Sequence, residues 1–215
     1  MIVNAQGVIL SRRSTGEYDR LAVMFTEDLG KLPVRFAGVL RPRGKMKALS
    51  ETAVWGEYRL HLSHRHEFAK CLGGRLVAGF PGVRGDLPRV TAALYCCELL
   101  DKLTAERAPN PEKFRLLSAT LAALEEAPNR WLSLAFGLRL MELTGFSLRA
   151  RAPEAAASVW ATLHEAPPAE LSAVPFDLLA ARESRRLLEG HFEAQAGRPL
   201  QVASFRESLR ASRLS

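Results

Sequence analysis

The chain has 215 residues, of which 47% are hydrophobic and 25% charged, as in a folded protein rather than a disordered one. Its net charge of +7 favours an acidic partner, and because no apolar run approaches the roughly 20 residues that span a bilayer, nucleic acid is favoured over a membrane. Three cysteines without a CxxC spacing argue against disulfides or structural zinc, and the N-terminal residues lack a signal-peptide pattern, which predicts a cytoplasmic protein.

The first 80 residues are rich in short alternating runs. Residues 18–26 and 31–39 alternate apolar and other side chains, which is typical of strands with one buried face, and a hairpin-length connection separates them. The apolar sets are Leu21, Val23 and Phe25 in the first run and Leu32, Val34 and Phe36 in the second. A further run contains Gly56, which we expect at a bulge. Together with further runs at the beginning and the end of this region, about five short strands are expected. The smallest common closed sheet of this kind is a five-stranded barrel of the OB type.

One stretch of this region, GKLPVRFAGVLRPRGKMK at residues 30–47, holds six cations and no acid. Like charges this close repel one another, so either a polyanion binds here or the cations only extend into water. On a small barrel, a basic strand that runs into a basic loop favours single-stranded nucleic acid, held mainly by its phosphates and with weak sequence preference. The predicted DNA-binding residues are Lys31, Arg35, Arg41, Arg43, Lys45 and Lys47.

Residue usage changes near residues 80–88, where two prolines and two glycines interrupt any regular element. Residues 1–80 carry 13 Lys or Arg against 7 Asp or Glu, whereas residues 81–215 carry 17 against 16. The second part is rich in Ala, Leu, Glu and Arg, with apolar residues at helical spacing. We therefore expect an α+β chain of two domains, an OB-type barrel at 1–80 and an α-helical bundle at 81–215.

The helical part predicts a partner site as well as a fold. Helices are expected at residues 88–103, 110–126, 129–145, 153–166 and 175–197. Asn110 is a natural N-cap, and the third helix is apolar almost all round, so it should be central and end at Gly145. Arg115, Arg130 and Arg139 lie among apolar residues of these helices, and a basic rim around an apolar groove suits an acidic peptide with apolar ends. The alternative is that these arginines are only solvated.

No catalytic constellation is present in the sequence. There is no GxxxxGK[ST] phosphate loop, no GxGxxG after a strand, no HExxH and no GxSxG. The histidines of HLSHRH, residues 61–66, do not converge as metal ligands should, and we expect one of Cys96 and Cys97 to face the core as an inert thiol. Glu98 and Asp101 are interpreted as an ordinary solvated helix face. We therefore expect no catalytic residue, metal or cofactor, and no enzyme activity.

Several of these motifs resemble a known family. Residues 7–45, with the segments GVIL, GEYDRL, FTEDLGK and RPRGK, are similar to the start of RecO, the family of bacterial recombination mediators. The similarity continues through residues 78–103 and 110–124 and closes with LLEGHFEAQAGRPLQVASFRESL at residues 187–209. It covers nearly the whole chain.

The resemblance implies an N-terminal OB barrel, a C-terminal helical domain and a non-enzymatic role in repair near the bacterial nucleoid. Members of the family bind single- and double-stranded DNA, anneal complementary strands, bind the acidic C-terminal tail of the single-stranded-DNA-binding protein, and help load RecA together with RecR. Many members carry a four-cysteine zinc module, but residues 146–175 contain no cysteine, so zinc is not expected here. The alternative is a generic RNA-binding OB module with a helical dimerisation domain.

Overall fold

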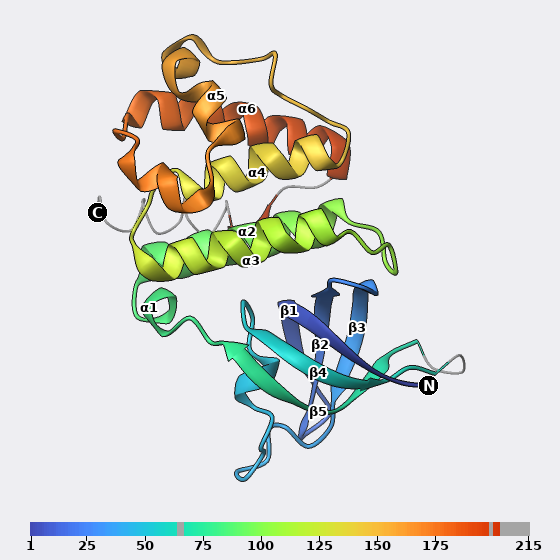
Figure 1. The fold of residues 1–215 in the computed structure, drawn as a ribbon. Coiled ribbons are helices and arrows are strands. Elements are labelled where there is room, and N and C mark those ends of the chain that lie inside the picture. Colours follow the sequence, from blue (N-terminus) through green and yellow to red (C-terminus); the bar gives the residue numbers. More distant parts are fainter. Residues whose placement is uncertain (64–66, 198–199, 203–215) are drawn as a thin grey trace. The chain divides into compact units, whose positions relative to one another are not determined.

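The chain folds into two compact units (Figure 1). The barrel unit comprises Met1–Phe80 and Thr104–Ser118, and the helical unit comprises Pro81–Leu103 and the part from Ala119 onward. Sequence composition alone places Thr104–Ser118 with the helices. The computed structural model describes residues 1–63, 67–197 and 200–202.

Five strands of the barrel unit close into a barrel in the order β1-β2-β3-β5-β4, which confirms the predicted architecture (Figure 1). The strands are β1 (Ile2–Thr15), β2 (Asp19–Thr26), β3 (Gly30–Phe36), β4 (Trp55–His61) and β5 (Ala69–Ala78). Neighbouring strands are antiparallel, except that β3 and β5 form a short parallel pair. The register between β4 and β5 shifts at Gly56, where a bulge is predicted.

The barrel core confirms the predicted inward face of β3 and differs in part from the face predicted for β2. The three apolar side chains of β3 are buried, as their alternation predicts. In β2, however, Ala22 and Met24 belong to the core and Arg20 shares their face. Of the three residues predicted to be buried, Phe25 is buried, whereas Leu21 and Val23 are only half buried. Apolarity alone does not predict which face of this strand is buried, because the buried Arg20 is stabilised by hydrogen bonds to Ser50 and Glu51.

The segment Thr104–Ser118 is tied to the barrel by backbone and ring contacts. The amide of Arg107 donates to the carbonyl of Lys31 at 2.8 Å, beside the first residues of β3. The ring of Trp55 packs edge-on against Phe114 with 6.1 Å between centroids. Trp55 therefore has a structural contact within the barrel unit.

Six α-helices are present in the described part of the chain. They are α1 (Pro81–Arg84), α2 (Leu87–Leu103), α3 (Pro111–Glu126), α4 (Leu132–Leu143), α5 (Ala157–Glu165) and α6 (Leu178–Ala196), and short 3-10 turns lie at Ala48–Ser50 (η1), Glu154–Ala156 (η2) and Pro168–Ala173 (η3). Asn110 caps α3 as predicted, since its side-chain oxygen accepts from the amide of Lys113 at 2.9 Å. Almost every residue of α4 is buried, and Gly145 follows its end with φ +85°. None of the helices in this part is long and apolar enough to cross a membrane.

Two expectations about α2 are wrong in detail. Cys96 and Cys97 are both fully buried, rather than one of them, and burial holds the pKa of the Cys96 thiol well above its usual value. Glu98 does not lie on an ordinary solvated face: its carboxylate accepts from the amides of Gln201 and Val202 at 2.7 and 2.9 Å. This acid therefore ties the described end of the chain to α2.

Candidate functional site

The basic loop, defined here as residues 37–47, leaves β3 and folds into two consecutive turns. The amide of Arg41 donates to the carbonyl of Gly38 at 3.2 Å, and the amide of Gly44 donates to the carbonyl of Arg41 at 2.9 Å. Val39 is buried in the barrel core and Met46 packs against that core. Because these two apolar side chains pack on the barrel core, they anchor the loop backbone to the barrel, and the charged side chains of the loop face solvent.

The four cations of the basic loop are all exposed: Arg41, Arg43, Lys45 and Lys47. The guanidinium of Arg41 lies 5.2 Å from the centre of the Tyr18 ring, a cation–π contact, and its charge also acts on the nearby Asp19 carboxylate. The other three cations form no ion pair with a residue in the described parts of the chain. Four positive charges within seven residues thus make a surface that suits a phosphate backbone.

The two predicted residues on β3 differ from those in the loop. The Arg35 side chain points away from the core, as predicted, and its Nε and a terminal nitrogen donate to Asp19 Oδ2 at 2.8 and 2.5 Å. A hydrogen bond from the Gly38 amide and the neighbouring Arg35 hold the pKa of Asp19 below its usual value. Lys31 is half buried. The charge of Arg35 is therefore partly offset, and the loop carries most of the free positive charge.

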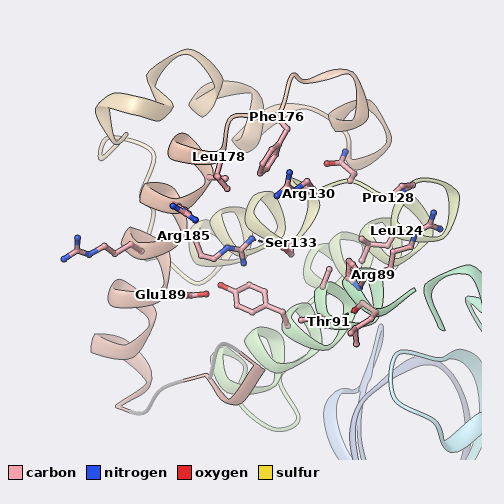
Figure 2. A pocket seen from close by; sticks show the side chains of 18 of the residues that line it. Arg89, Thr91, Leu124, Pro128, Arg130, Ser133, Phe176, Leu178, Arg185 and Glu189 are labelled. Carbon is pink, nitrogen blue, oxygen red and sulfur yellow. Dashed lines mark hydrogen bonds between the residues drawn. The ribbon is translucent and has the colours of Figure 1, made fainter. Parts of the chain in front are cut away.

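A second candidate site is a pocket of about 740 Å³ in the helical unit (Figure 2). Phe176, which precedes α6, and Leu178, the first residue of α6, give it apolar surface, while Tyr95 of α2 and Leu124 of α3 line it and are almost fully buried. Its lining includes the arginines Arg89, Arg130, Arg182, Arg185 and Arg186. Glu189 and Glu193 of α6 also line it, so it is basic but not uniformly so.

Two of these arginines are held by aromatic rings, and Figure 2 labels the pair Arg130 and Phe176. The guanidinium of Arg130 lies 3.8 Å from the centre of the Phe176 ring. Arg185 lies 5.4 Å from the centre of the Tyr95 ring and donates to Ser133 Oγ at 3.3 Å. Stacking of this kind orients the planar donors of arginine toward a carboxylate.

The three arginines that the sequence singles out for peptide binding have different positions. Arg130 lines the pocket. Arg115 belongs to the barrel unit, where its Nε donates to the carbonyl of Pro111 in its own helix at 3.2 Å. Arg139 is half buried and donates to the carbonyls of Leu163, at 3.0 Å, and Ala166 at the end of α5. Only Arg130 of the three lies in the pocket lining, and Arg139 satisfies carbonyls that a helix end leaves open.

Replacing Arg139 with methionine is expected to lower the free energy of unfolding by about 2 kcal/mol, because two hydrogen bonds from a charged group to helix-end carbonyls are lost. Urea denaturation measures the change. Arg115→Met is the matched control and should change stability by less than about 0.5 kcal/mol, since its side chain is exposed. Equal effects of the two substitutions would contradict the structural role of Arg139.

Within the described ranges, no group of three or more His, Cys, Asp or Glu side chains could hold a metal ion. His61 ends β4, but His64 and His66 lie outside the described residues. The expected lack of zinc therefore stays a prediction, to be checked by metal analysis of the purified protein.

Comparisons with known proteins match two consecutive parts of the chain. The family model described as "Recombination protein O N terminal" matches residues 1–80, and "Recombination protein O C terminal" matches residues 84–152. A DNA repair protein RecO from Desulfitobacterium hafniense (strain DSM 10664 / DCB-2) is 29% identical over 148 residues, which is 69% of this chain and 54% of the relative. The DNA repair protein RecO from Pelobacter propionicus is 33% identical over 57% of this chain and 50% of the relative. The one from Bacillus subtilis is 26% identical over 59% of this chain and 49% of the relative. The chain spans about half the length of these relatives. Because two family models of the same protein match consecutive parts of it and together cover more than half of its length, the chain belongs to the RecO family.

Proposed function

We propose that this chain acts in recombinational DNA repair by binding single- and double-stranded DNA through the basic loop and β3. It anneals complementary strands and, with RecR, helps load RecA onto strands coated by the single-stranded-DNA-binding protein. The observation that carries the proposal is the set of four exposed cations on a structured loop of a closed barrel, in a chain whose relatives are named DNA repair proteins. The protein acts by binding, without catalysis.

Phosphate contacts suit the task of annealing. The basic loop contains no aromatic side chain of its own, and the nearby Tyr18 ring is already in contact with Arg41. Stacking of bases on this surface is therefore limited, and cations contact phosphates without regard to sequence. A strand held in this way can shift its register and search for its complement.

The pocket of the helical unit supplies a separate site for recruitment. Its arginines match the carboxylates of an acidic peptide, and its apolar surface from Leu87, Phe176 and Leu178 matches apolar residues at the end of that peptide. We infer that it binds the acidic C-terminal tail of the single-stranded-DNA-binding protein. The strand and the protein that coats it are then held at different places on one chain.

The test is annealing of complementary DNA strands that are already coated with the single-stranded-DNA-binding protein. The proposal expects acceleration by this chain, and loss of that acceleration when the coating protein lacks its acidic tail. RNA strands of the same sequence serve as the comparison, because a generic RNA-binding module would bind them at least as well as DNA and would not respond to the tail.

A further inference from the structure

The first end of the basic loop and the residues that follow its second end, Ser50 and Glu51, are hydrogen-bonded to three consecutive residues, Tyr18 to Arg20, at the start of β2. We propose that Asp19 and Arg20 act as positioning residues that fix the two ends of the basic loop and so hold its cations in place for phosphate binding. Neither side chain contacts DNA in this scheme. The inference rests on the proposed function, because it assigns a role within the same DNA site.

The first end of the loop is held by Asp19 and its neighbour. Asp19 Oδ1 accepts from the amide of Gly38 at 2.7 Å, while its Oδ2 accepts from Arg35. The carbonyl of Tyr18 accepts from the amide of Leu40 at 2.9 Å. Gly38 has φ +65°, a conformation that glycine adopts without strain, so the chain turns sharply where Asp19 holds it.

The second end of the loop is held by Arg20. This side chain is only 4% exposed, and one terminal nitrogen lies 2.7 Å from Ser50 Oγ, 2.9 Å from Glu51 Oε1 and 3.2 Å from the carbonyl of Ser50. The carbonyl of Lys47, the last residue of the loop, accepts from the Ser50 amide and hydroxyl. Glu51 is paired with Arg12 as well, at 2.9 Å.

A buried arginine at this place has a clear physical consequence. A charge taken out of water is tolerated only where hydrogen bonds and an opposite charge surround it, and here those partners, Ser50 and Glu51, follow closely after the loop's far end. Without these hydrogen bonds the far end of the loop would no longer be held, and its four cations would move apart because like charges repel. A disordered loop must then be ordered on DNA binding, which weakens affinity.

The distinguishing experiment compares Asp19→Ala with Asp19→Asn. Both remove one negative charge beside the loop, which on charge alone would tighten DNA binding. Asparagine keeps the oxygen that accepts from Gly38, whereas alanine does not. We expect Asp19→Ala to weaken binding of a fluorescently labelled single-stranded oligonucleotide about tenfold and Asp19→Asn to bind within about twofold of the unsubstituted protein. Tighter binding by both variants would overturn the inference.

Arg20→Met tests the other end in the 215-residue chain, at a temperature where circular dichroism shows the protein folded. Arg20→Met is expected to weaken DNA binding about tenfold, and Arg20→Lys is expected to weaken it less. The control Arg75→Met removes an exposed arginine of the barrel and should change DNA affinity less than about twofold. In a chain where Arg41, Arg43, Lys45 and Lys47 are alanine, Arg20→Met should change affinity less than about twofold. An equal loss in both backgrounds would show that Arg20 does not act through the loop. If the four-alanine chain binds as tightly as the unsubstituted protein, the proposed DNA site itself is wrong.

Discussion

Replacement of Arg41, Arg43, Lys45 and Lys47 by alanine is expected to remove most of the salt dependence of DNA binding. For single strands each phosphate contact contributes about −0.7 to the slope of log affinity against log salt, so four contacts account for a slope of about −3. The four-alanine variant should have a slope shallower by that amount and an affinity lower by about 10²-fold at low salt. Titrations of one oligonucleotide at several salt concentrations measure both quantities.

The fold should tolerate this change, because the loop is held by groups that the variant keeps. Val39, the bonds from Asp19 and the bonds from Arg20 all remain, and the four replaced side chains are exposed. Thermal melts should therefore be nearly unchanged. A folded variant with an unchanged slope would place the DNA site elsewhere on the chain.

The second large effect is expected in the pocket of the helical unit. Arg130→Glu combined with Arg182→Glu should weaken binding of the acidic tail peptide by at least about 30-fold, because two charges that attract carboxylates are replaced by two that repel them. Both side chains are exposed, so the fold should persist. Isothermal titration calorimetry with the isolated peptide measures the loss.

Arg115→Glu is the matched control for the pocket variant. It reverses an exposed arginine that does not line the pocket, so peptide affinity should change less than about twofold. The pocket variant should also retain its affinity for naked DNA. If Arg115→Glu weakens the peptide as much as the pocket variant does, the three arginines named from sequence share one surface and the pocket assignment is wrong.

The barrel could be predicted from sequence because alternation in Leu32, Val34 and Phe36 sets one buried face directly. The exposure of Arg35 follows from the same alternation. The neighbouring β2 misleads, since Leu21 and Val23 are more apolar than the Ala22 and Arg20 that share the inward face. Arg20 is buried because Ser50 and Glu51, about 30 residues later in the chain, bind its side chain. The periodicity of a strand contains no information on such distant partners.

The pocket illustrates the same limit in the helical unit. Arg130 could be named from sequence because it adjoins an apolar helix, but its companions Arg182, Arg185 and Arg186 lie on α6, far away in the chain. Helical spacing shows which residues share a face, while the convergence of two helices depends on tertiary packing. Arg139 has the same local pattern as Arg130, yet it is bonded to the end of α5.

The central claim is that DNA and the acidic tail peptide occupy different sites on one chain. It is tested most directly by measuring peptide affinity with and without a saturating single-stranded oligonucleotide, using a scrambled acidic peptide as the control for general charge effects. The account predicts that the two ligands bind together and that peptide affinity changes less than about twofold. Competitive displacement of the peptide by DNA would contradict it, because the two ligands would then share a surface.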